Sequence, residues 1–183
     1  MFAALLLVSA GPAGLAGEGG GFETQAAWVT RWGVRSADNV AQVFDSLAGM
    51  GINTVFFQVR GSCDALYESS LEPWSDVLSG TLGVDPGWDP LETAIIEARR
   101  NNLNLHAWIN VFPAWPVSDD GDPPPVTKPL HVYRAHPDWL ALDASGSSMP
   151  LVREEATYHY AFLSPTNEAV QEHTEKVVAD LAG

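Results

Sequence analysis

Two stretches of the chain, residues 52–60 and 103–110, share one pattern: an apolar run that ends in polar side chains. Near-continuous apolar runs of this length are typical of parallel strands that are buried on both faces. Residues 26–34 predict a further strand ahead of them. The chain is therefore expected to contain three strands separated by longer segments.

Helices are predicted between the strands and after the last one. Residues 37–49 place their apolar positions on one face, and Ser36 can cap the first turn. Residues 90–100 show the same spacing, and Asp89 is the expected cap. A third helix is expected further on, over residues 168–181. Its predicted buried positions are Val170, Thr174, Val177, Val178 and Leu181.

Alternation of strands and helices predicts a parallel α/β fold. An open nucleotide-binding sheet would normally carry a glycine-rich turn after its first strand, and residues 31–36 contain none. The long loops follow strands, as they do in a barrel. Because a closed barrel needs eight βα units and typically about 250 residues, residues 26–183 are expected to be the N-terminal three βα units of a (β/α)8 TIM barrel in a truncated chain.

Residues 1–25 resemble a signal peptide followed by a glycine-rich linker. The apolar stretch at residues 2–8 is followed by small residues, although no Lys or Arg precedes it. Such a run is too short to cross a bilayer, so no integral membrane segment is expected. These features predict a protein that is secreted or held in the periplasm or cell envelope.

Composition excludes several classes of function. The net charge is −14 with only nine Lys and Arg, and no basic patch suits nucleic acid. Cys63 stands alone, so it cannot form an intrachain disulfide and is expected to be a passive loop residue. The five His residues lack metal-binding spacing. We expect no metal and no cofactor.

Polar side chains gather where the second and third strands end. Gln58 and Arg60 lie two residues apart and so share one face, as do Trp108 and Asn110. The C-terminal ends of barrel strands carry the active site. These four residues, with Asp64 in the following loop, are the predicted substrate-binding groups. Two alternatives stay open for Arg60, which can bind a ligand or pair with Asp64 to brace the loop.

Aromatic residues extend this prediction towards sugars. Tyr67, Trp74 and Trp108 are predicted substrate contacts, and Trp115 is a further possible platform for a sugar ring. Buried tryptophans more often serve as core residues, so packing is the alternative for each ring. His106 is expected to be a hydrogen-bonded core residue rather than a contact.

Several motifs in combination resemble one protein family. They are residues 53–60 (NTVFFQVR), 64–67 (DALY), 72–75 (EPWS), 86–91 (PGWDPL), 106–110 (HAWIN) and 162–165 (FLSP). Together they resemble the glycosyl-hydrolase-like family 10, bacterial secreted or envelope TIM barrels similar to α-amylase-clan glycosidases. Two departures are Gly61, where proline is usual, and Val111-Phe112, where Pro-Tyr is usual.

The resemblance implies a glycoside hydrolase acting on a polysaccharide or on the glycan strand of peptidoglycan. It also implies that the catalytic carboxylates, which are unknown here, lie beyond residue 183. Glycoside hydrolysis uses two carboxyl groups, so this chain alone is expected to be inactive. The alternative is a non-catalytic barrel that binds carbohydrate.

Overall fold

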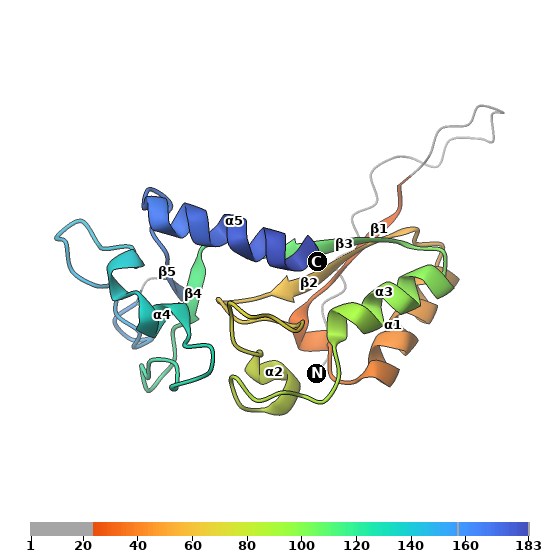
Figure 1. Ribbon diagram of the computed structural model, residues 1–183, viewed down its shortest axis with the longest axis horizontal. Coiled ribbons are helices and arrows are strands. Elements are labelled where there is room, and N and C mark those ends of the chain that lie inside the picture. Colours follow the sequence, from red (N-terminus) through yellow and green to blue (C-terminus); the bar gives the residue numbers. More distant parts are fainter. Residues whose placement is uncertain (1–23, 157, 183) are drawn as a thin grey trace. The chain divides into compact units, whose positions relative to one another are not determined.

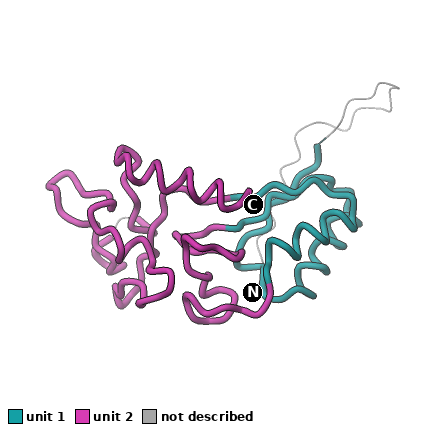
Figure 2. Tube along the Cα trace, viewed as in Figure 1, with its two compact units in different colours: residues 1–59, 89–108 teal, residues 60–88, 109–183 magenta. Residues whose placement is uncertain are grey.

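The computed structural model describes residues 24–156 and 158–182 and divides the chain into two compact units (Figure 1; Figure 2). Unit 1 consists of Met1–Val59 and Asp89–Trp108, and unit 2 consists of Arg60–Trp88 and Ile109–Gly183. A signal-peptide-like segment and linker are predicted over residues 1–25, and residues 1–23 of it lie outside the described part of the chain.

A three-stranded sheet forms the centre of unit 1. Its strands are β1 (Ala26–Val29), β2 (Thr54–Arg60) and β3 (Asn104–Ile109), in the order β1-β2-β3. Strands β1 and β2 run parallel, and their register places Trp28 beside Phe56. The predicted parallel α/β arrangement is thus confirmed for this unit.

Two helices pack against each other in unit 1: α1 (Ala37–Gly49) and α3 (Pro90–Arg100). The Ser36 side chain accepts a hydrogen bond from the Asn39 N–H at 3.1 Å, and Asp89 accepts one from the Glu92 N–H at 2.9 Å. Both predicted caps and both predicted helices are therefore confirmed. These caps satisfy backbone donors that the first turn of a helix leaves unpaired.

The side chains of β2 alternate between two faces of the sheet. Phe57 points towards α1, where its ring lies 6.1 Å from that of Phe44, and both rings are fully buried. Phe56 points to the opposite face and stacks on Trp28 at 4.7 Å. His106 of β3 continues this row at 5.1 Å from Phe56. His106 is exposed, so the expectation of a core histidine was wrong. The reason is that β3 is an edge strand and leaves His106 uncovered.

The first predicted strand is shorter than expected. Strand β1 ends at Val29, and a 3-10 turn, η1 (Arg31–Gly33), follows it. The Gly33 N–H donates to the Thr30 carbonyl at 2.9 Å, and the Arg31 N–H donates to Gln58 Oε1 at 3.0 Å. These bonds take the place of a strand ladder, which is why the extended conformation stops.

Unit 2 contains short elements and one long helix: α2 (Asp76–Ser79), β4 (Pro113–Pro116), α4 (Val132–Ala135), η2 (Pro137–Trp139), β5 (Tyr160–Phe162) and α5 (Glu168–Ala182). Strands β4 and β5 form an antiparallel pair, where a long loop was predicted. The apolar core of this unit contains Cys63, Ala114, Val132, Leu163 and Val170.

Helix α5 agrees closely with the helix predicted over residues 168–181. Val170 and Val177 are buried as expected. Val178 is 49% exposed, so its predicted burial was wrong. Val178 adjoins Val177 but lies about 100° further round the helix, away from the buried face. Within the described residues, no helix is long and apolar enough to cross a bilayer.

Candidate functional site

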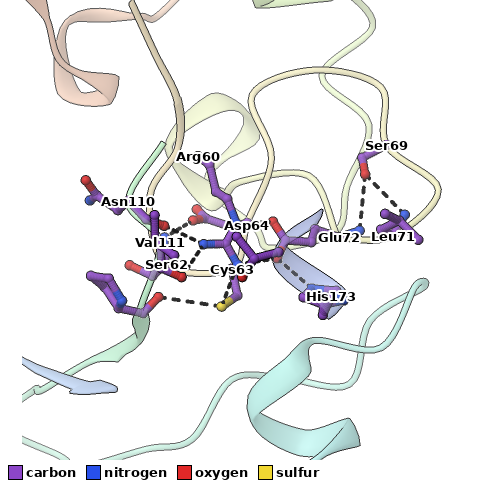
Figure 3. A network of polar contacts seen from close by, with 12 residues as sticks. Arg60, Ser62, Cys63, Asp64, Ser69, Leu71, Glu72, Asn110, Val111 and His173 are labelled. Carbon is purple, nitrogen blue, oxygen red and sulfur yellow. Dashed lines mark hydrogen bonds and ion pairs between the residues drawn. The ribbon is translucent and has the colours of Figure 1, made fainter. Parts of the chain in front are cut away.

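Arg60, the last residue of β2, is 98% buried in unit 2 and forms a two-point ion pair with Glu72 (Figure 3). Its Nε donates to Glu72 Oε2 at 2.7 Å, and its Nη2 donates to Oε1 at 2.6 Å. The planar guanidinium matches a carboxylate in this two-point geometry. The pair ties the end of β2 to the loop that follows it.

The remaining donors of Arg60 are also used within unit 2. Nη1 donates to the backbone carbonyls of Asn110 and Val111, the latter at 2.9 Å, and Nη2 also contacts Cys63 Sγ at 3.0 Å. The guanidinium thus fixes the backbone that follows β3. These contacts brace the loops after β2 and β3. Direct contact of Arg60 with a ligand stays a prediction.

Glu72 is the partner of Arg60 that sequence reasoning missed. The sequence indicated that a buried arginine needs a carboxylate, but Asp64 was the residue considered for that role. Glu72 is 1% exposed and also lies 3.3 Å from His173 Nε2 of α5. Burial alone would raise the pKa of Glu72, but Arg60 and His173 outweigh it and lower that pKa to about 2. Glu72 is therefore ionised at neutral pH.

Asp64 braces the loop that follows β2. It is 3% exposed, and its two carboxylate oxygens accept hydrogen bonds from the Ser62 N–H and the Ser75 hydroxyl. The bond from Ser62 reaches back two residues along the chain and holds the start of this loop. The described contacts of Asp64 are thus those of a structural residue.

Cys63 and His131 complete the buried polar layer. Burial raises the pKa of the Cys63 thiol to about 12, which agrees with the predicted passive role because the thiolate is the reactive form. Burial lowers the pKa of His131. His131 Nδ1 accepts from the Tyr133 N–H at 3.2 Å, so the Nε2–H is the donor to the Ser62 carbonyl at 2.8 Å. Sequence reasoning did not single out His131.

Asn110 presents an available polar group at the predicted site. Its backbone N–H donates to the Arg60 carbonyl at 3.2 Å, and its own carbonyl accepts from the Arg60 guanidinium. Its half-buried side chain points away from that guanidinium (Figure 3). Among residues 24–156 and 158–182, no hydrogen-bond partner is found for the Asn110 amide. The backbone of Asn110 is thus fixed while its side chain is available to a ligand.

Two predicted site residues lie in unit 1. Gln58 is 4% exposed and its Oε1 is occupied by the Arg31 N–H. Trp108 is half-buried and follows His106 by two residues, so the two side chains share one face of β3. Phe56, beside His106, lies on the same face as Gln58 by the same alternation. Gln58 and Trp108 therefore lie on the same face of the sheet in unit 1.

The two remaining predicted residues lie in unit 2. Tyr67 is 4% exposed, and its hydroxyl is buried without a hydrogen-bond partner in the described part of the chain. Burial raises the pKa of Tyr67. Trp74 is half-buried, and its backbone carbonyl accepts from the Gly83 N–H at 2.8 Å. Neither ring is placed against a ligand, and both roles in sugar binding stay predictions.

No group of three or more His, Cys, Asp or Glu side chains is arranged to hold a metal ion in the described ranges. The polar layer around Arg60 consists instead of ion pairs and hydrogen bonds. Its chemistry is that of a rigid support for the loops after β2 and β3.

Stability should fall in acid because of Glu72. Its pKa is lowered to about 2 from an ordinary value of 4.5, so its stabilising contribution is complete above about pH 4.5. We expect that contribution to disappear as the pH falls from about 4.5 towards 2. Denaturant unfolding measured across this range should show the loss. In Glu72→Gln the same segment of the profile should be flatter, and an unchanged slope would contradict the assignment.

Two glycosyl hydrolases resemble part of this chain in sequence. A glycosyl hydrolase from Escherichia coli K12, DigH, is 38% identical over 104 residues, which cover 52% of this chain and 23% of that protein. The glycosyl hydrolase YngK from Bacillus subtilis is 39% identical over 100 residues, which cover 55% of this chain and 19% of that protein. The chain therefore matches only about a quarter or less of these relatives' length.

A solved structure shares the fold. A hypothetical protein from Ruminiclostridium thermocellum superposes with a TM-score of 0.51 at 15% identity, covering 84% of this chain and 70% of that chain. The family model described as Glycosyl hydrolase-like 10 matches residues 25–182, nearly the whole of the described chain. The chain belongs to the glycosyl hydrolase-like 10 family.

Proposed function

We propose that the protein carrying this chain hydrolyses glycosidic bonds in a polysaccharide or in the glycan strand of peptidoglycan. The observation that carries the proposal is a buried Arg60–Glu72 pair that fixes the backbone of Asn110 while its amide stays available. Family membership supports the reaction class, and the relatives DigH and YngK are named glycosyl hydrolases. An amide can accept and donate to sugar hydroxyls at once.

The sheet of unit 1 is proposed to be the start of a (β/α)8 barrel. Within the described residues, β1 and β3 each have one edge without a neighbouring strand. A groove of about 360 Å³ runs beside β1 and α1, and its walls include Trp28, Val43 and Leu47. These unpaired edges and the groove are consistent with the proposal that further βα units pack next to the sheet.

The catalytic carboxylates are proposed to come from other parts of the protein. A general acid must carry a proton near neutral pH, whereas the pKa of Glu72 is lowered to about 2. Both side-chain oxygens of Asp64 already accept hydrogen bonds, from the Ser62 N–H and from the Ser75 hydroxyl. Both carboxylates are therefore better suited to holding the loop than to proton transfer.

Export to the periplasm, envelope or medium is part of the same proposal. Its support is the apolar run at residues 2–8 followed by small residues. An extracytoplasmic location would give the protein access to a cell-wall glycan.

The proposed function is tested by incubating the full-length protein with purified glycan strands and with neutral polysaccharides. Hydrolysis releases one new reducing end for each bond that is cleaved. Release from at least one glycan is the expected result. Binding of glycans without any release would instead support the non-catalytic carbohydrate-binding barrel.

A further inference from the structure

A second polar and aromatic pocket lies in unit 2, and neither Arg60 nor Glu72 lines it. It has a volume of about 490 Å³, and its walls include Trp115, Pro116, Ser118, Asp122 and Arg134. Two prolines of the run at residues 123–125 complete the walls. Pockets with an apolar wall and a few convergent polar groups are typical ligand sites.

Trp115 forms the aromatic wall and is held in a fixed orientation. Its indole N–H donates to the Asp122 carbonyl at 2.8 Å. Its ring packs against the buried His131 ring, with the ring centroids 5.3 Å apart and the ring planes at 76°. Ala114, the preceding residue of β4, is buried in the apolar core and holds the backbone beside Trp115 in place. The half-buried ring is thus an anchored surface rather than a mobile side chain.

Two side chains of opposite charge accompany this ring. Arg134 uses Nε to bond the Pro124 carbonyl, and no carboxylate pairs with its guanidinium among residues 24–156 and 158–182. Asp122 is exposed, and its carboxylate has no ion-pair partner in the same ranges. A guanidinium donates hydrogen bonds and a carboxylate accepts them. One charge of each sign favours a ligand that is rich in hydroxyl groups and carries no net charge.

We infer that the Trp115 pocket binds an uncharged pyranose ring of the glycan, as a subsite separate from the Asn110 region. The apolar face of the sugar would lie on Trp115, and its hydroxyls would meet Arg134 and Asp122. The two regions are close along the chain, because Trp115 follows Asn110 by five residues, a span of at most about 18 Å. A short oligosaccharide can therefore reach both. This inference rests on the proposed function, since it concerns the same glycan.

The test separates binding from hydrolysis. The full-length protein is labelled with 15N at its tryptophan indoles, and the Trp115 signal is assigned by its loss in Trp115→Phe. Chitotetraose and cellotetraose serve as uncharged probes, and a tetramer of galacturonic acid serves as the anionic probe. We expect an uncharged tetramer to shift the Trp115 signal saturably and the anionic tetramer to bind at least about fivefold more weakly.

Variants show whether the pocket itself is responsible. Trp115→Ala should weaken binding of the uncharged tetramer about fivefold or more, and Arg134→Ala should weaken it by a similar factor. Trp32→Ala removes a 59% exposed ring elsewhere in the chain and should leave the affinity unchanged. Thermal melting checks folding, and Arg134→Ala carries the test if Trp115→Ala unfolds.

The inference would be overturned if no uncharged tetramer shifts the Trp115 signal, or if the anionic tetramer binds equally well. Affinities of Trp115→Ala and Arg134→Ala equal to that of Trp32→Ala would also overturn it. Failure of the proposed function is recognised separately, because it means that no reducing ends are released whatever the binding result.

Discussion

Replacing Glu72 with alanine should destabilise the protein by about 3–5 kcal/mol, the cost typical of removing one partner from a buried ion pair. Arg60 and Glu72 are 2% and 1% exposed, and two hydrogen bonds of 2.6 and 2.7 Å join them. Without Glu72 the positive charge of the Arg60 guanidinium would stay buried without the carboxylate that pairs with it. Unfolding by urea, followed by circular dichroism, measures the loss in the free energy of unfolding.

The matched control is an exposed ion pair. Arg100 and Asp45 also form a salt bridge, but both side chains are 52% exposed. Asp45→Ala should therefore cost no more than about 1 kcal/mol. The double variant Arg60→Ala/Glu72→Ala should cost less than the sum of the single changes, because neither charge is left alone. Equal effects of Glu72→Ala and Asp45→Ala would refute the buried-pair interpretation.

Replacing Asn110 with alanine should reduce glycan turnover by about 5- to 150-fold, because the lost hydrogen bonds to the substrate are worth about 1–3 kcal/mol. The change should leave stability nearly intact, since the amide has no hydrogen-bond partner in the described part of the chain. Steady-state kinetics of the full-length protein and a thermal melt measure the two quantities.

Asn104→Ala is the control for this prediction. Asn104 begins β3 and is exposed, whereas Asn110 follows the end of the same strand. Active sites of barrels form at the C-terminal ends of their strands, so Asn104→Ala should retain full turnover. If the two variants lose turnover equally, the placement of the site at this end of the strands is wrong.

Local features of the fold were predictable from the sequence. Ser36 and Asp89 were identified as helix caps because a cap bonds to a residue only three positions away, and the structure has both bonds. The alternation of β2 was likewise readable, since Phe56 and Phe57 face opposite sides. Features fixed by neighbours in sequence therefore agree with expectation.

Features that depend on distant partners were missed. Glu72 bonds Arg60 across 12 residues and His173 across 101 residues, and no local pattern distinguishes it from Asp64. Pairing of β4 with β5 joins Pro113 to Phe162, with a register shift inside a four-residue strand. Such short strands carry too few residues for a clear alternation.

The availability of the Asn110 amide could not be predicted either. The Arg60 guanidinium donates to the Asn110 backbone carbonyl and forms no hydrogen bond with the Asn110 side chain. The folded loops after β2 and β3 decide which atoms of Asn110 form hydrogen bonds. Sequence spacing placed Asn110 at the C-terminal end of β3, but it could not show that the backbone and the side chain of this residue differ in their contacts.

We propose that the full-length protein hydrolyses a glycan through a site supported by Arg60 and Glu72. The most direct measurement is the release of reducing ends from purified cell-wall glycan strands by the full-length protein and by its Asn110→Ala variant. We predict sustained release by the wild-type protein and a rate about 5- to 150-fold lower for the variant at equal folded concentration. Absence of release by a folded wild-type protein that still binds the strands would contradict the claim.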